Sequence, residues 1–366
     1  WRFGVTAQRE DLGTDDQTAY GADILYQPSE RTFFSFEYAR TDGTNIIDQS
    51  LSFDGGLTGG PQDGFAGTGR AYKVEAQADL QELGLATPGL IGGYFEDRSA
   101  GFSTLSYRSA NDERLYGLFL EMDVAERWSM RADFDHFEDS TGREKDEGSL
   151  ALTYHYSSRV DLSFGIEHLD EVRPGVAADT GRRTDVAFRV DVQQSENFRW
   201  FGYAQGTVER SGGLSRNNRI GLGAEYAFNN NWTALVEVSD GNLGAGGQIK
   251  LSYADEVGNT TYFGYALDPN RELDGQSLTG RDKGRFVAGA TRKVNDQITL
   301  TGENAYDLFG SRKSLTSTYG VNYAATERLT FDGSLEIGRV RDQLVNTDFD
   351  RTALSLGATY EDERLT

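Results

Sequence analysis

The sequence predicts an all-β protein, built as a large antiparallel transmembrane β-barrel of roughly 20 or more strands. Three observations predict this fold. A tight polar turn recurs about every 30 to 38 residues, as expected of a repeated hairpin unit. Between the turns, apolar and polar residues alternate with the period of a strand. The short turns also alternate with longer polar loops, so we expect short periplasmic turns at one end and long extracellular loops at the other.

The repeated turn consists of three mostly polar residues and a fourth that is usually apolar and opens the next strand. One period has room for two strands, one tight turn and one longer loop, which indicates a β-hairpin array. The predicted copies of the turn are 125–128, 157–160, 195–198, 229–232, 256–259, 295–298, 326–329 and 362–365.

The segments between turns read as strands. In the segment 160–167, apolar residues occupy every even position, and polar residues or glycine occupy every odd one. In the segment 329–337, helical spacing would group Asp332 and Glu336 with the apolar residues, which excludes a helix. A soluble β-sandwich would give the same alternation, but its strands average about 5–6 residues. Runs of about 9–12 residues instead match the length needed to cross a bilayer at a tilt.

Longer polar loops are predicted between the later turns, at 139–147, 171–183, 209–218, 240–247, 267–284, 308–314 and 341–350. The first third of the chain is less regular. A turn at 27–31 precedes a Gly-rich loop from about 42 to 69, and interruptions follow at 80–89 and 109–113. If every interruption is a turn, the short turns and long loops of this part of the chain do not fall at the same ends of the barrel as those of the later repeats. We therefore expect one of them to be a bulge or bend inside a long strand.

Composition limits the possible functions. The chain of 366 residues has a formal net charge of −22 and no Cys. The acidic balance disfavours nucleic acid as a partner, and the absence of Cys excludes disulfides and thiol chemistry. A mean hydropathy of −0.56 and the lack of long apolar runs argue against helical membrane spans. A barrel is compatible with the low mean hydropathy and with the lack of long apolar runs, because every second residue faces a polar lumen.

The chain ends suggest a longer protein. The sequence opens directly on a strand-like segment at 1–7 without Met, and Leu365 begins a further strand after the last turn. Barrels of this class need an even strand number and a closed last strand. We therefore expect residues 1–366 to be a single β-barrel domain, with additional chain at both ends.

The strand sequences resemble known membrane barrels. The segments at 20–23, 114–117, 223–226 and 230–232 resemble outer-membrane barrels of Gram-negative bacteria, while those at 90–96 and 100–104 resemble the C-terminal barrel of very large outer-membrane proteins with repeated N-terminal sandwich modules. This resemblance implies a non-enzymatic pore or anchor domain of a larger surface or secreted protein, located in the bacterial outer membrane. Its partners would be membrane lipid, lipopolysaccharide, and other modules of the same polypeptide or envelope proteins.

Two alternative functions remain open. One is a solute channel or receptor-type transporter whose plug lies before Trp1. The other is a soluble β-rich adhesin or structural protein.

The candidate functional residues are spread over the strands. Acids on the polar faces are expected to line the lumen and to favour cations, among basic residues that include Arg131, Arg189 and Lys250. Tryptophans beside the tight turns are expected to be interfacial anchors. The acids are Asp161, Glu167, Glu225, Glu237, Asp332 and Glu336, and the tryptophans are Trp128, Trp200 and Trp232.

No catalytic or cofactor site is predicted. We interpret the three histidines, His136, His155 and His168, as lumen-lining or interfacial residues rather than metal ligands. No Ser lies in a recognisable nucleophile motif. A loosely bound surface Ca²⁺ is the most that the acidic loops suggest, at 268–275 or around the acids of the first long loop, Asp42, Asp48, Asp54 and Asp63.

Overall fold

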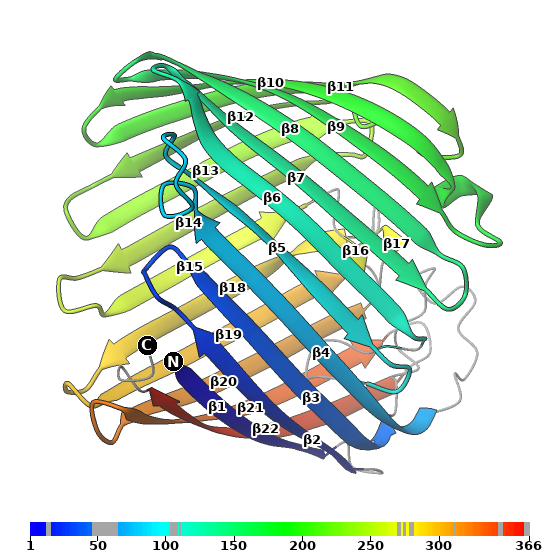
Figure 1. The fold of residues 1–366 in the computed structure, drawn as a ribbon, viewed down its shortest axis with the longest axis vertical. Coiled ribbons are helices and arrows are strands. Elements are labelled where there is room, and N and C mark those ends of the chain that lie inside the picture. The colour runs from blue at the N-terminus through cyan, green and yellow to red at the C-terminus, as the bar shows by residue number, and fades with distance from the viewer. Residues whose placement is uncertain are drawn as a thin grey trace.

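The chain folds into one closed antiparallel β-barrel. The computed structural model describes residues 1–11, 16–45, 65–102, 109, 111–268, 272–273, 276–277, 282–309, 312–342 and 347–361. Its main sheet has 20 strands, each paired with the next along the chain. β1 (Arg2–Asp11) also pairs with β22 (Thr347–Glu361), and this pair closes the wall, with the blue first strand beside the red last one (Figure 1). The predicted fold class and strand number are confirmed.

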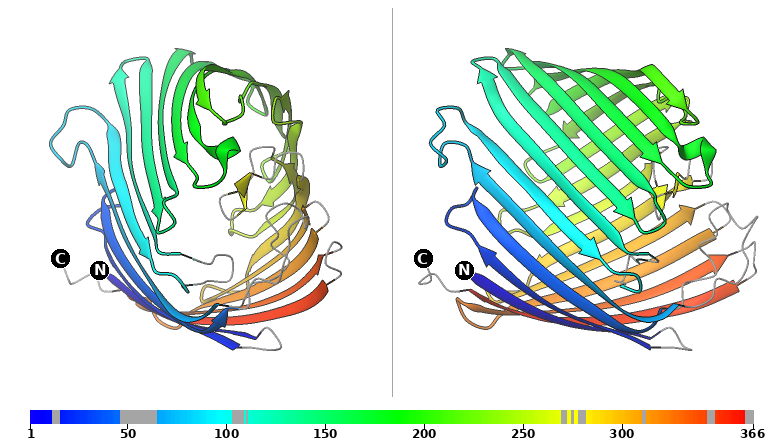
Figure 2. Two further views of the ribbon diagram at one scale, coloured as in Figure 1. Left: turned by 90° about the vertical axis from the view of Figure 1, so that its right-hand side faces the viewer. Right: turned by 45° about the vertical axis from the view of Figure 1, so that its right-hand side comes forward.

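The wall strands are 8 to 15 residues long and cross the wall obliquely (Figure 2), as closure into a barrel requires. Between β1 and β22 they are β2 (Asp16–Tyr26), β3 (Phe33–Asn45), β4 (Phe65–Asp79), β5 (Gly89–Arg98), β6 (Glu113–Ala125), β7 (Trp128–Asp139), β8 (Glu144–Ser157), β9 (Val160–Val172), β10 (Gly181–Ser195), β11 (Phe198–Gly212), β12 (Arg219–Ala227), β13 (Trp232–Gly241), β14 (Gly246–Ala254), β15 (Thr260–Leu267), β18 (Asp282–Lys293), β19 (Ile298–Phe309), β20 (Arg312–Ala324) and β21 (Leu329–Asp342).

Little of the described chain lies outside this wall. A single-turn 3₁₀ helix, η1 (Ala177–Asp179), sits between β9 and β10, and a two-stranded sheet pairs β16 (Glu272–Leu273) with β17 (Gln276–Ser277). Among the described residues, no helix is long and apolar enough to cross a membrane.

The repeated turn motif has a local chemical cause. Its first residue is often Asn, Asp, Ser or Thr, whose side-chain oxygen accepts hydrogen bonds from backbone N–H groups inside the turn. Asn295 Oδ1 accepts from Gln297 N at 2.9 Å and from Ile298 N at 2.8 Å. Thr326 Oγ1 accepts in the same way from Leu329 N, at 3.0 Å. The polar first residue thus closes the turn, and the apolar fourth residue starts the next strand.

The predicted long loops lie between the expected strands, but several are shorter than predicted. The loop predicted at 139–147 reduces to 140–143, because β7 and β8 remain paired as far as Glu138 and Glu144. The loop predicted at 240–247 likewise reduces to 242–245. The ends of these strands are rich in charged and small residues, which hide the alternation of apolar and polar positions in the sequence. The backbone pairing between the strands nevertheless continues through them.

The expectation of a bulge or bend in the first third is wrong. Residues 80–88 connect β4 to β5, and residues 99–112 connect β5 to β6 at the opposite end of the strands. The first connection lacks the repeated turn motif: Asp79 Oδ1 accepts from Gln81 N at 2.7 Å, and Leu85 N donates to Leu80 O at 2.9 Å. With both connections counted, the one at 80–88 falls at the short-turn end of the barrel and the one at 99–112 at the long-loop end, in step with the later repeats.

Several sequence predictions fall on residues outside the described ranges. They are the last turn at 362–365, most of the loop at 42–69 including Asp48, Asp54 and Asp63, and most of the segment 268–275. Asp42 belongs to β3 rather than to the loop, and its Oδ1 accepts from Thr68 Oγ1 at 3.1 Å. Because β22 pairs with β1, the wall is continuous without a further strand; that the chain is part of a longer protein stays a prediction.

Candidate functional site: the inner wall of the barrel

The two faces of the sheet differ sharply in chemistry. Along β9, Phe164 and Ile166 lie on one face with 49% and 46% of their surface exposed. The opposite face carries Asp161, Ser163 and Glu167. Directly paired residues share a face in an antiparallel sheet, so the apolar face continues from strand to strand. A lipid-embedded barrel turns this apolar face outward, and we call the opposite, polar face the inner wall.

All six predicted acids lie at inner-wall positions, on four strands. On β9 they are Asp161 and Glu167, on β12 Glu225, on β13 Glu237, and on β21 Asp332 and Glu336. Each shares a face with the polar residues among which the alternation groups it. Their role in ion preference stays a prediction.

The acids differ in how far their charge is compensated. Glu225 lies 3.4 Å from Arg199 Nη2, and Glu167 lies 3.8 Å from Arg183 Nη2. Glu237 has neutral donors instead: it accepts from Tyr203 Oη at 2.9 Å and from Gln248 Nε2 at 2.7 Å. A phenol and an amide orient a carboxylate without cancelling its charge. Glu237 therefore presents negative charge to the lumen.

A repeated arrangement of tyrosine, glycine and acid spans three strands at a time. Tyr203 on β11 lies across Gly221 on β12 to reach Glu237 on β13. A Cβ atom added at Gly221 would lie only 2.2 Å from Tyr203 Cζ. Only glycine leaves room for the ring to cross the middle strand.

Among the described residues, the same arrangement is also found at two other places on the inner wall. Tyr94 crosses Gly117 to donate to Asp135 at 2.6 Å, and Tyr262 crosses Gly289 to donate to Glu303. This arrangement is not predicted from the sequence. The inner-facing glycines were visible in the alternation, but the register across three strands was not.

Two loops fold over the inner wall at the long-loop end. Between β5 and β6, Gly101 O accepts from the buried Thr41 Oγ1 at 3.3 Å. Between β11 and β12, Leu214 is buried, and its carbonyl accepts from Arg210 Nη1 at 2.8 Å. Asn217 in the same loop donates its N–H to Thr207 Oγ1 at 2.8 Å. These contacts place loop residues inside the barrel and narrow this end of the lumen.

The inner wall also carries a Ser–His–Asp arrangement near the short turns. His155 Nδ1 lies 2.8 Å from Asp161 Oδ1, and its Nε2 lies 3.1 Å from Ser129 Oγ. Acyl transfer would further require hydrogen-bond donors around a developing oxyanion. Ser129 instead lies in β7 between paired strands, directly opposite Asp123, whose carboxylate would repel an oxyanion. We interpret the arrangement as a polar network.

His168 does not join this network. It lies opposite Gly148, well apart in register from the His155–Asp161 pair, as expected. Its Nδ1 lies 2.9 Å from Thr184 Oγ1.

Aromatic rings gather on the outer face beside the short turns. Trp128 lies 4.9 Å from Tyr154, and Trp232 lies 5.1 Å from Tyr253, between ring centroids. Trp200 is the third residue of β11, also close to a short turn. Rings in this position match the aromatic girdle of membrane barrels, and the anchoring role of these tryptophans stays a prediction.

Comparisons with known proteins agree with the architecture. No protein-family model and no curated protein matches the chain. Among solved structures, the ferric-catecholate import receptor Fiu from E. coli K12 is similar, with a TM-score of 0.52 and 8% identity over 98% of this chain and 81% of that one. The FrpB iron transporter from Neisseria meningitidis is similar with a TM-score of 0.51 and 10% identity, over 98% of this chain and 81% of that one. The copper transporter OprC is similar with a TM-score of 0.51 and 8% identity, over 98% of this chain and 80% of that one.

The fold is thus that of bacterial outer-membrane barrels, and the chain is an outer-membrane protein. A closed barrel leaves no sheet edge unpaired, as the hydrocarbon layer requires. Its outward apolar residues supply the surface that contacts lipid, for example Leu118, Ile220 and Leu222, which are 65%, 67% and 57% exposed. The comparisons do not support the narrower resemblance to very large repeat-containing proteins.

Proposed function

We propose that this chain is a non-enzymatic transport barrel, a solute channel or receptor-type transporter that passes hydrophilic solutes and prefers cations. The observation that carries the proposal is a closed wall of 20 strands with a charged and polar inner face. A barrel of this size is wide enough to hold an aqueous lumen. In the described part of the chain, only loops, η1 and the β16–β17 hairpin lie outside the wall.

The similar structures support transport more than anchoring. Their names describe an import receptor and two transporters for iron or copper species. At 8–10% identity they do not identify the solute. The role as anchor for a larger surface protein depends on chain outside these residues, and it stays a prediction.

The cation preference follows from acids such as Glu237. A negative side chain on a low-dielectric wall raises the local concentration of cations. Tyr203 and Gln248 hold this carboxylate in place without neutralising it.

The test is conductance across a planar lipid bilayer with the purified barrel inserted. We expect ion current, and a reversal potential in a KCl gradient that shows cation preference. Glu237→Gln should reduce that preference. Asp240→Asn is the matched control, because Asp240 lies on the same strand but on the opposite face. A folded barrel that conducts no current would contradict the proposal, as would an equal effect of the two substitutions.

A further inference from the structure

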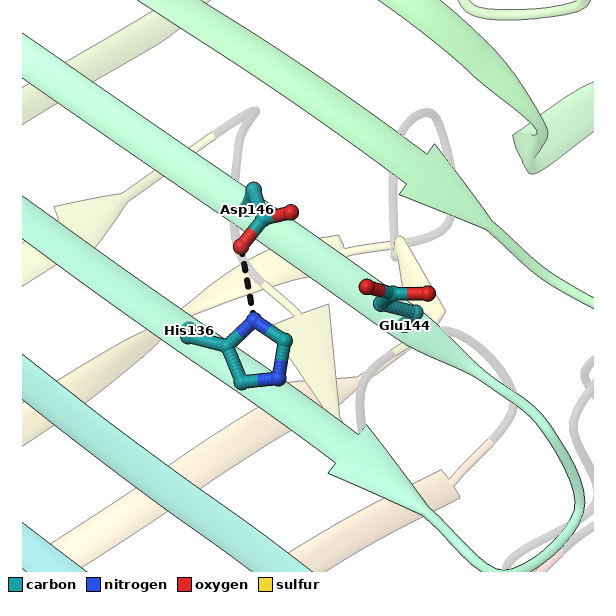
Figure 3. Close-up of side chains that lie close together, drawn as sticks. All are labelled: His136, Glu144 and Asp146. Atoms are coloured by element: carbon teal, nitrogen blue, oxygen red, sulfur yellow. Dashed lines mark hydrogen bonds and ion pairs between the residues drawn. The ribbon is translucent and has the colours of Figure 1, made fainter.

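A cluster of one histidine and two acids lies on the outer face of the β7–β8 hairpin, near the long-loop end. His136 on β7 is directly opposite Asp146 on β8, and Glu144 precedes Asp146 by two residues. One ligand-type atom from each residue lies within 4.8 Å of those of the other two (Figure 3). Cross-strand and diagonal neighbours on one face are within side-chain reach. The backbone register therefore fixes the cluster.

The cluster shares the outward apolar face rather than the inner wall. His136 is opposite Tyr116, and the two rings stack at 4.6 Å between centroids. Tyr116 also contacts Phe134, and both aromatic residues are 38% exposed. His136 itself is only 8% exposed. The imidazole is thus held on the outer surface, at the boundary between the aromatic rings and the charged strand ends.

We propose that His136, Glu144 and Asp146 bind a divalent transition-metal ion of the zinc type. One imidazole nitrogen and two carboxylates form a set of ligands suited to Zn²⁺, which commonly takes three protein ligands and a fourth from water. The imidazole favours Zn²⁺ over Ca²⁺ and Mg²⁺, which prefer oxygen alone. His136 Nδ1 now lies 2.6 Å from Asp146 Oδ1. Tetrahedral ligands at about 2.1 Å from the metal lie about 3.4 Å apart, so a small side-chain movement makes room for the ion.

A further carboxylate is placed to orient the imidazole. Metal-bound histidines almost always donate the other ring N–H to a carboxylate, a backbone carbonyl or water. Glu138 Oε2 lies 3.9 Å from His136 Nε2, and Glu138 Oε1 accepts from Arg114 Nη1 at 2.8 Å. With the metal on Nδ1, the proton resides on Nε2 and faces Glu138. Glu138 is a positioning residue, held in turn by Arg114.

Charge balance on the outer face also favours a cation. Charged side chains on a lipid-facing wall are destabilising toward the membrane centre and tolerated near its boundary. Glu144 and Asp146 bring two negative charges to this face. A divalent ion with two carboxylates and a neutral imidazole is uncharged overall. Metal binding would also join β7 to β8 at the end where they separate into a loop.

The proposal departs from the expectation that the histidines bind no metal. His136 and Asp146 are ten residues apart across a hairpin whose loop was predicted to span 139–147. In that prediction, Glu144 and Asp146 were loop residues without a defined face.

The experiment is isothermal titration of the EDTA-treated, dialysed barrel in detergent with ZnCl₂, repeated with CaCl₂ and MgCl₂. We expect one Zn²⁺ per chain with a dissociation constant on the order of micromolar or tighter, and weaker binding of the other two ions. Glu144→Gln and Asp146→Asn should each weaken Zn²⁺ binding at least about tenfold, and Glu138→Gln by roughly 10-fold to 100-fold. Tryptophan fluorescence checks that each variant is folded.

His168→Gln is the matched control, because His168 pairs with Thr184 on another part of the wall, and binding should be unchanged. The proposal is overturned if Zn²⁺ does not bind, if Ca²⁺ binds as tightly, or if Glu144→Gln and Asp146→Asn bind like the control. Zn²⁺ binding is measured in detergent, and conductance is measured in a lipid bilayer. A failure to bind Zn²⁺ would therefore leave the conductance result unaffected, and a failure to conduct would leave the Zn²⁺ result unaffected.

Discussion

Replacing Gly221 by Ala should destabilise the barrel, because the tyrosine ring that crosses this glycine has no room for a methyl group. The added Cβ would lie 2.2 Å from Tyr203 Cζ and 2.5 Å from its Oη. Carbon atoms in contact are about 3.5–4.0 Å apart, so the ring must move by more than about 1 Å. The hydrogen bond from Tyr203 to Glu237, 2.9 Å long, would then exceed hydrogen-bonding distance.

The expected loss of unfolding free energy is about 2–4 kcal/mol. Overpacking costs roughly 1–3 kcal/mol, and a hydrogen bond to a charged group contributes about 1.5–3 kcal/mol. Removing a strand glycine returns roughly 0.5–1 kcal/mol. The measurement is guanidinium unfolding from lipid vesicles, followed by tryptophan fluorescence.

Gly165→Ala is the matched control for this prediction. Gly165 also faces inward, but an added Cβ would meet only Ala187 Cβ at an ordinary 3.7 Å, so this variant should be as stable as the parent or slightly more so. Tyr203→Phe removes the hydroxyl alone and should account for part of the loss at Gly221. If Gly221→Ala and Gly165→Ala give the same stability within about 0.5 kcal/mol, the steric reasoning is refuted.

Three further predictions concern a buried ion pair, the lipid-facing surface and one turn. Asp185 is 3% exposed and lies 2.6 Å from Arg183 Nε, so Asp185→Asn should cost about 3–5 kcal/mol in the same unfolding assay. Phe164→Lys places a charge at an outward position in mid-strand and should cost up to about 2–4 kcal/mol in lipid vesicles. In the β14–β15 turn, a side-chain hydrogen bond from Asn259 holds the pKa of Asp255 below its usual value. That stabilisation is present above the ordinary Asp pKa of about 3.9 and is lost as the pH falls through the lowered value, so Asp255→Asn should show less acid dependence when unfolding is compared at pH 5 and pH 3.

The features that the sequence predicted well are those with local causes. The turn at 295–298 is specified by a single Asn whose side chain binds two backbone N–H groups within three residues. The face of Glu225 or Asp332 follows from alternation within one strand. Neither feature depends on which strand lies alongside. The strand number followed from counting such local signals.

The features that the sequence did not predict depend on pairing between strands. Tyr94 and Asp135 are far apart in the chain and meet only because both pair with Gly117 in the same register. The connection at 80–88 was misread because its turn is closed by Asp79 and backbone bonds, without the repeated motif. Loop positions inside the lumen, such as Leu214, depend on tertiary contacts that no local pattern encodes.

The acids on the inner wall differ in the groups that bind them. Basic residues often pair with an acid two positions along the same strand, which the period of two places on the same face. Arg131 lies 2.8 Å from Asp133, and Arg189 lies 2.6 Å from Asp191. The Arg189–Asp191 pair carries no net charge, whereas Arg131 also contacts Glu121, so its group of one base and two acids is negative. The tyrosine-bound acids have neutral donors instead, so the same hydrogen bonds that order the wall leave negative charge on it. Stability and cation preference therefore arise from different atoms of one arrangement. The phenol orients the carboxylate, and the carboxylate attracts cations. Tyr203→Phe should lower stability while leaving ion preference close to that of the parent, whereas Glu237→Gln should lower the preference.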